Sequence, residues 1–140
     1  FDLSLFNTFR SYININSFFP RSHKENKDNR GSFSELTRAF SMGQTSFSIT
    51  KKEVVRGNHF HTRKIERFSV IKGKARIQLR EILSDNKFEF IIDGDKPSYV
   101  DIPVWYTHNI ENIGDEELIT VFWINEHYNE DASDTYLENV

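Results

Sequence analysis

The feature that most constrains the fold is a succession of short strand-like segments from Gly31 onward, each ended by a turn signal. Apolar and polar residues alternate within several of these segments, and Gly, Asn and Asp separate them, as in antiparallel sheets that close into a barrel or sandwich. The expected strands cover residues 32–36, 44–50, 53–61, 66–71, 75–83, 87–92, 99–102, 107–112 and 118–125. This pattern predicts an all-β fold but leaves the jelly roll as one of several possibilities.

Composition narrows the class of protein. The chain has 140 residues, the size of one domain, and its thirteen Phe, five Tyr and two Trp predict a core rich in aromatic side chains. A net charge of −3 with interspersed signs offers no basic surface for nucleic acid. There is no cysteine, no signal-peptide layout and no apolar run of membrane-spanning length. We therefore expect a cytoplasmic protein that binds neither membranes nor nucleic acid.

The beginning of the chain differs from the rest. Apolar residues within 1–15 recur with the spacing of a short amphipathic helix, so we expect residues 1–20 to form a helical connector. Residues 21–30 are almost wholly polar and are expected to form a loop. The barrel domain would then cover residues 31–140, with an acidic and irregular tail from Glu126.

Two histidines and a glutamate stand at strand-like spacing near the middle of the chain. His59 and His61 are two positions apart, so on a β-strand their imidazoles leave the same face, about 7 Å apart along the backbone. Residues 62–65 can reverse the chain, and an antiparallel strand begun at Glu66 brings its carboxylate beside the histidines. Two imidazoles and one carboxylate form most of a divalent metal site.

This stretch, His-x-His-x4-Glu-x6-Gly, resembles the first conserved motif of the cupin superfamily. Residues 103–112 resemble the second motif, Pro-x-Gly-x-x-His-x-x-x-Asn, with Trp105 where the family usually has glycine. The turn before His108 must therefore be built differently. The resemblance implies a cupin (RmlC-like) jelly-roll barrel with a short N-terminal helix. It also implies a metal bound by His59, His61, Glu66 and His108. Their chemistry alone does not choose between zinc, manganese, iron and nickel.

Other polar residues are candidates for substrate binding. Arg56 and Asn58 precede the first ligand and are expected near the mouth of the barrel. Lys64, in the turn between ligands, is a further candidate, although lysines in such turns are more often plain surface residues. Residues 30–35, Arg-Gly-Ser-Phe-Ser-Glu, resemble a segment of nucleotide-sugar 3,5-epimerases whose arginine and acid line the sugar-nucleotide pocket. That resemblance makes Arg30 a candidate to grip phosphate oxygens.

Further segments extend the resemblance along most of the chain. Residues 28–33, 43–44, 56–61, 107–117 and 134–135 are similar to the C-terminal cupin domain of capsular polysaccharide assembling proteins of the CapF type. In that family the cupin binds zinc and epimerises a UDP-linked 4-keto-6-deoxy-N-acetylhexosamine on the way to UDP-N-acetyl-L-fucosamine. An N-terminal short-chain reductase domain uses NADPH. The resemblance thus implies Zn²⁺, a UDP-sugar substrate and a reductase domain or chain as partner. As in many cupins, it also implies a homodimer.

The implied reaction removes the C3 proton beside the C4 ketone and returns a proton to the opposite face. Tyr106 is the first candidate for proton transfer, because on a strand it shares a face with His108, and Glu35 and His127 are further candidates. Three other readings stay open: a nucleotide-sugar 3,4-ketoisomerase, an iron dioxygenase, and a non-catalytic cupin that binds sugar nucleotide or dimerises a neighbouring enzyme.

Overall fold

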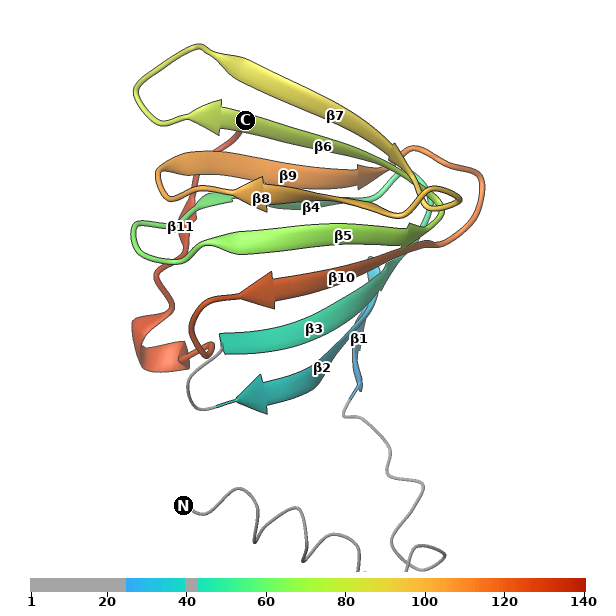
Figure 1. Cartoon of the computed structure of the whole chain (residues 1–140), viewed down its shortest axis with the longest axis horizontal. Helices are drawn as coiled ribbons and strands as arrows, with labels where there is room; N and C mark the ends of the chain where they lie inside the picture. Colours follow the sequence, from blue (N-terminus) through green and yellow to red (C-terminus); the bar gives the residue numbers. More distant parts are fainter. Residues whose placement is uncertain (1–24, 40–42) are drawn as a thin grey trace, which may run out of the picture.

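The computed structural model describes residues 25–39 and 43–140, and the helix expected within residues 1–20 lies outside them. The described chain is built almost entirely of strands, with one 3-10 turn, η1 (Figure 1). The elements are β1 (Glu25–Asp28), β2 (Gly31–Ala39), β3 (Gly43–Thr50), β4 (Val55–Phe60), β5 (Glu66–Lys72), β6 (Lys74–Glu81), β7 (Lys87–Asp93), β8 (Ser98–Ile102), β9 (Tyr106–Asn112), β10 (Leu118–Ile124), η1 (Glu130–Ala132) and β11 (Tyr136–Leu137). Each strand expected from the sequence has a counterpart among them.

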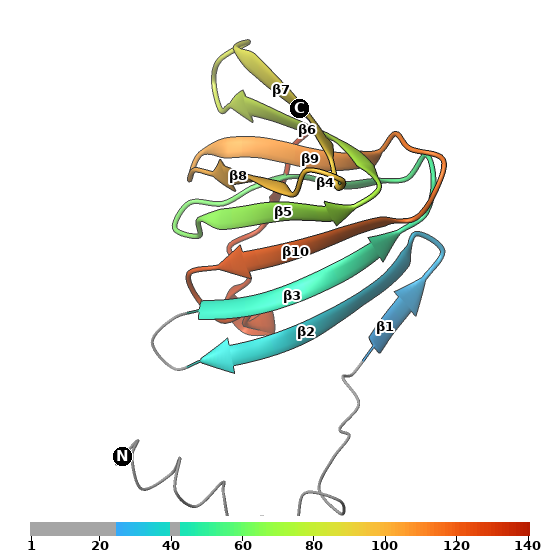
Figure 2. The same cartoon turned by 45° about the vertical axis from the view of Figure 1, so that its right-hand side comes forward.

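The strands form two antiparallel sheets that face each other (Figures 1 and 2). One sheet has the order β1-β2-β3-β10-β5-β8, and the other has the order β11-β4-β9-β6-β7. Strands that are neighbours in a sheet are often far apart in sequence, as β10 is from β3 and β9 from β4. The chain thus passes repeatedly from one sheet to the other, which is the jelly-roll arrangement of cupins. The expected fold is confirmed.

The hydrophobic core lies between the sheets on the side of β5, β6 and β8. It is mainly aliphatic, with Ile77, Val70 and Leu118 fully buried and Phe68 among its few aromatic members. The expectation of a largely aromatic core was therefore wrong for the described residues. Phe88 and Phe90 lie on the edge strand β7 and remain 47% and 41% exposed, because β7 has a neighbour on only one side.

The other half of the interior is polar. Strand β3 alternates so that Gln44, Ser46, Ser48 and Thr50 are buried, while the apolar residues between them are only partly buried. Thr120 of β10 pairs with Ser48 and is also buried. Because apolar side chains usually fill such positions, a row of buried hydroxyls indicates an interior built to hold something polar.

Two segments expected to be irregular contain regular structure. Strand β1 lies within the predicted loop 21–30 and pairs with β2, and its wholly polar sequence suits an edge strand exposed to water. The tail contains η1 and then β11, which pairs with β4. The single described helical segment, η1, is far too short and too polar to cross a membrane.

Candidate metal centre

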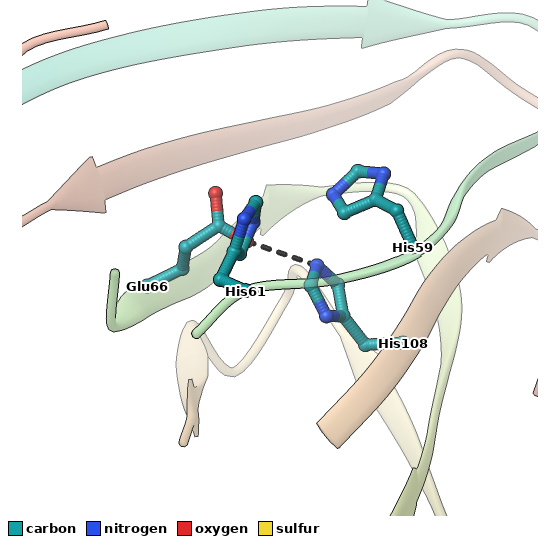
Figure 3. Close-up of side chains that lie close together, drawn as sticks. All are labelled: His59, His61, Glu66 and His108. Carbon is teal, nitrogen blue, oxygen red and sulfur yellow. Dashed lines mark ion pairs between the residues drawn. The ribbon is translucent and has the colours of Figure 1, made fainter. Parts of the chain in front are cut away.

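The four predicted ligands come from separate elements and converge between the sheets (Figure 3). His59 is on β4, His61 follows its end, Glu66 opens β5, and His108 is on β9. The pairing of β4 with β9 sets His59 directly opposite His108. One ligand atom of each residue lies within 4.8 Å of those of the others. The structure thus brings the predicted set together.

The donor atoms at the centre are buried and lack hydrogen-bond partners. His108 Nε2 and His61 Nε2 lie 2.9 Å and 3.3 Å from Glu66 Oε2, and none of the three atoms makes a hydrogen bond with good geometry. Burying polar atoms without partners is costly. A cation bound between them would satisfy all three, and separations near 3 Å are those between neighbouring ligands of a small divalent ion.

The outer nitrogens of two imidazoles do have partners. His61 Nδ1 donates to the carbonyl oxygen of Asp134 at 2.5 Å, and His108 Nδ1 donates to that of Tyr106 at 3.2 Å. With Nδ1 as the hydrogen-bond donor, Nε2 is the nitrogen that faces the centre and can bind a metal. This is the arrangement that metal-binding histidines adopt.

Burial and proximity set the charges of the centre. Burial, followed by the neighbouring His108, lowers the pKa of His59 to about 4, so this imidazole is neutral near pH 7. Burial opposes ionisation of Glu66, but the adjacent imidazoles of His108 and His61 outweigh it and hold the pKa of this carboxyl well below its usual range. Neutral imidazole and one ionised carboxylate are the forms that bind a divalent cation, so the residues fit zinc or a similar metal.

Two unusual backbone turns aim the ligands. Gly57, with φ 100°, and Asn58, with φ 60°, form a bulge in β4 just before His59. Trp105 stands where cupins usually have glycine and adopts the left-handed conformation itself, with φ 65°. Its N–H donates to the carbonyl of His61 at 2.8 Å, and its ring stacks on Phe60 at 5.9 Å. The turn therefore forms even though tryptophan replaces the glycine of the motif.

The loop between His61 and Glu66 is held by a residue that the sequence did not single out. Asp134 is 5% exposed, and its carboxylate accepts hydrogen bonds from the backbone N–H groups of Thr62, Arg63 and Lys64. Burial opposes its ionisation, but the Thr62 hydroxyl and these N–H groups hold the pKa of Asp134 well below its usual range. Asp134 lies about 70 residues from the loop in the sequence, so no pattern near the loop could predict this contact.

A cavity of about 930 Å³ opens from the metal ligands along the polar half of the interior. Its wall includes three of the metal ligands, His59, His61 and Glu66, and the buried Ser46 and Ser48 of β3. The tail contributes Tyr128, Glu130 and Thr135. Its volume and mixed lining suit a ligand larger than a simple sugar.

The predicted arginines lie together on the cavity wall. Arg30 and Arg56 both line it. The Arg30 guanidinium pairs with Asp28 at 2.5 Å, whereas Arg56 donates to the hydroxyl of Thr50 at 3.0 Å and has no carboxylate partner among the described residues. Burial, with a smaller effect of Arg30, lowers the pKa of Arg56. A half-buried guanidinium that donates to a neutral hydroxyl is suited to bind phosphate.

The other predicted substrate contacts differ in placement. Lys64 lines the cavity and is 3% exposed, so it is not a plain surface lysine. Its ammonium donates to the carbonyl of Ser133. Asn58 is absent from the lining, and its side-chain oxygen accepts a hydrogen bond from Asn109.

The predicted proton-transfer residues are also separated. Glu35 is half-buried and lines the cavity. Tyr106 packs against the hydrophobic core, with its ring 6.3 Å from that of Phe88, and His127 lies in the tail just after β10. Neither Tyr106 nor His127 lines the cavity.

Fold and site together define the class of this protein: a jelly-roll cupin whose interior presents three histidines and a glutamate to one point. Residues 26–136 match the model of the polysaccharide biosynthesis C-terminal domain. The chain therefore belongs to that family.

Known relatives share this part of the chain. It is 35% identical to UDP-2-acetamido-2,6-beta-L-arabino-hexul-4-ose reductase of Pseudomonas aeruginosa, over 95% of this chain and 36% of that protein. The crystal structure of capsular polysaccharide assembling protein CapF from Staphylococcus aureus superposes with a TM-score of 0.92 at 41% identity, over 97% of this chain and 37% of that one. The chain thus spans little more than a third of each relative. The resemblance to CapF-type cupins stands.

A more distant likeness concerns the fold alone. Oxalate decarboxylase of Lactobacillus farciminis superposes with a TM-score of 0.64 at 18% identity, over 74% of this chain and 31% of that one. The two chains share the barrel fold.

Proposed function

We propose that this chain is a metal-dependent, zinc-containing epimerase that acts at C3 of a UDP-linked 4-keto-6-deoxy-N-acetylhexosamine. The proposal places the chain in the synthesis of capsular or surface polysaccharide precursors, in particular UDP-N-acetyl-L-fucosamine. The observation that carries it is the buried set of unpartnered donor atoms of His61, Glu66 and His108, two of which, His61 and Glu66, line the cavity. Its similarity to CapF and to a UDP-sugar reductase supports the substrate class.

The cavity can bind the diphosphate and the hexose of the substrate through different residues. Arg30 and Arg56 would hold the diphosphate, since guanidinium groups bind phosphate oxygens in pairs. The hexose would lie toward the ligands, where a bound divalent cation polarises a ketone and stabilises the adjacent enolate. Ser46 and Ser48 also line the cavity, and their hydroxyls can accept hydrogen bonds from sugar hydroxyls or donate to them.

Proton exchange at C3 requires a group that takes a proton and a group that returns it. Glu35 is a predicted proton-transfer residue on the cavity wall, and we propose it as the carboxylate that serves one face of the sugar. Tyr106 and His127 would need a different arrangement of the chain to reach the sugar, because neither lines the cavity. We propose that Lys64, which is buried and lines the cavity, contacts the substrate.

The relatives also suggest partners. Because the P. aeruginosa relative is a reductase of which this chain matches 36%, we propose that an NADPH-dependent short-chain reductase, as a domain or a separate chain, uses the product. A homodimer is proposed as well, and light scattering of the purified chain would test it.

The decisive experiment compares the chain with its Glu66→Gln variant, and with Glu89→Gln as a matched control on the exposed strand β7. Each protein is analysed for metal and incubated with the UDP-4-keto-6-deoxy sugar in deuterated water. We expect about one zinc per chain and deuterium at C3 for the wild type and Glu89→Gln. Glu66→Gln should lose both, because its amide carries no charge.

Other outcomes separate the alternatives. Zinc without deuterium incorporation would contradict the epimerase and favour a binding cupin. Iron with oxygen consumption would favour a dioxygenase, and migration of the ketone without bound metal would favour a 3,4-ketoisomerase. Wild-type protein that takes up no metal would contradict the proposed centre.

A further inference from the structure

One residue of the tail contacts the metal centre in two independent ways. The first is through its side chain, which closes the loop between His61 and Glu66. Asp134 Oδ1 accepts from the Thr62 hydroxyl at 2.6 Å, and Oδ2 accepts from the N–H groups of Arg63 and Lys64 at 3.0 Å and 3.1 Å. The N–H of Thr62 also donates to Oδ1, so three successive backbone groups converge on one carboxylate. The bonds fix how far Glu66 lies from His61.

The second contact is through the backbone of the same residue. The carbonyl oxygen of Asp134 accepts the Nδ1–H of His61 at 2.5 Å. This bond requires a proton on Nδ1, so the nitrogen left to bind a metal is Nε2, the atom that lies 3.3 Å from Glu66 Oε2. Asp134 adopts φ 47°, and this left-handed backbone lets its carboxylate and carbonyl both face the ligand loop.

The neighbours of Asp134 hold it in this position. Arg63 donates to the carbonyl of Ala132 at 2.7 Å, and the ammonium of Lys64 donates to the carbonyl of Ser133. Beyond Asp134, the tail pairs with β4, where Leu137 lies opposite His59. Figure 1 shows the tail leading from η1 to β11, the edge strand beside β4. The segment is thus anchored on both sides of the ligand loop.

We propose that Asp134 is the positioning residue of the metal centre: it fixes the tautomer of His61 and the geometry of the loop that joins His61 to Glu66. The inference rests on the metal site of the proposed function. Asp134 does not touch the metal and acts through His61 and residues 62–64. Partners of this kind raise the affinity of metal-binding histidines, and their loss typically weakens metal binding about 10- to 100-fold.

A purely structural role would have different consequences. If Asp134 only capped a surface loop, its replacement would lower the melting temperature and leave zinc affinity unchanged at a temperature where the protein is folded. If Asp134 positions the ligands, zinc affinity and the protonation pattern of His61 change in the folded protein.

The test compares wild type, Asp134→Asn and Asp134→Ala with Asp131→Asn. The control removes the same charge from an exposed position in the same segment. Metal-free chains, shown to be folded by circular dichroism, are titrated with Zn²⁺ in competition with a chromophoric chelator. The tautomer of His61 is read from long-range ¹H–¹⁵N spectra of the metal-free chains. We expect Asp131→Asn to match wild type and Asp134→Asn to bind zinc about 10- to 100-fold more weakly, with mixed tautomers at His61.

The result that overturns the inference is a folded Asp134→Asn chain that binds zinc within about twofold of wild type and keeps the Nδ1–H tautomer. If the Asp134 variants do not fold, Thr62→Val removes one bond to the carboxylate, and an unchanged zinc affinity there would count against the inference. Wild type that binds no zinc would defeat the proposed function, whereas the tautomer comparison would still decide the role of Asp134.

Discussion

His59 differs from the other two histidines of the centre in how its charge is controlled. Its imidazole lies 5.0 Å and 4.7 Å from those of His61 and His108, between ring centroids. Burial and these neighbours lower its pKa to about 4. In the unfolded chain the pKa of a histidine is about 6.5, so between these values the unfolded state binds a proton that the metal-free folded state rejects.

Replacing His59 should therefore change how the stability of the metal-free protein depends on pH. We expect wild type to lose about 2 kcal/mol of unfolding free energy between pH 7 and pH 5 through this residue, and His59→Asn to be spared that loss. Urea unfolding of both chains in the presence of a chelator, at the two pH values, measures the difference. Equal pH dependence in the two chains would contradict a lowered pKa for His59.

The turn that leads into β9 shows how an element tolerates a residue its motif disfavours. Trp105 occupies the left-handed region, which costs an L-residue about 1–2 kcal/mol. Its carbonyl accepts from the N–H of Ile82 at 2.9 Å, and its N–H bonds to His61. The ring contact with Phe60 offsets part of the backbone strain.

Two substitutions at Trp105 separate backbone strain from ring packing. Both Trp105→Ala and Trp105→Gly remove the ring, but glycine adopts positive φ freely. We therefore expect Trp105→Gly to be more stable than Trp105→Ala by about 1 kcal/mol, although both should be less stable than wild type. Thermal and urea unfolding would measure this order, and a glycine variant less stable than the alanine variant would refute the argument.

Elements with local periodicity could be predicted, and those fixed by distant contacts could not. The alternation of residues 44–50 and 66–71 predicts β3 and β5 because each strand has one buried face. Strand β1 and the short β11 carry no such pattern, since pairing with β2 and β4 alone defines them.

The same division applies to the site. The His-x-His-x4-Glu spacing predicted His59, His61 and Glu66, and a motif predicted His108. The expected hairpin was wrong, because β4 pairs with β9 in one sheet whereas β5 pairs with β10 and β8 in the other. The roles of Lys64 and Asp134 depend on the tail folding back over the ligand loop. No sequence pattern near the loop predicts this contact. Tyr106 shows a further limit: its strand was predicted, but its side chain packs on the apolar core.

At the scale of the whole molecule, one half of the interior stabilises the fold and the other half is suited to bind a ligand. Aliphatic side chains around Ile77 fill one half, and the buried hydroxyls of β3 line the cavity in the other. Ser48 is 1% exposed, and its hydroxyl has no hydrogen-bond partner. Such a group reduces stability unless a ligand bonds to it.

This division predicts opposite effects of two substitutions to alanine. Ile77→Ala should lower the free energy of unfolding by about 3 kcal/mol, because it leaves a cavity in a packed core. Ser48→Ala should leave it unchanged or raise it by up to about 1 kcal/mol, while weakening the binding of a UDP-sugar. Urea unfolding and calorimetric titration test the pair. A strongly destabilised Ser48→Ala chain would show that the hydroxyl supports the fold.

The position of Asp134 also bears on how the protein is made. On the ribosome, residues 25–124, with every strand of the barrel except β11, emerge before the segment that contains Asp134. Until that segment is synthesised and folds back, the ligand loop lacks the carboxylate that holds it and His61 lacks its carbonyl partner. A chain cut short within the tail would then form a barrel that acquires metal poorly, so the metal is best inserted after translation has passed this point.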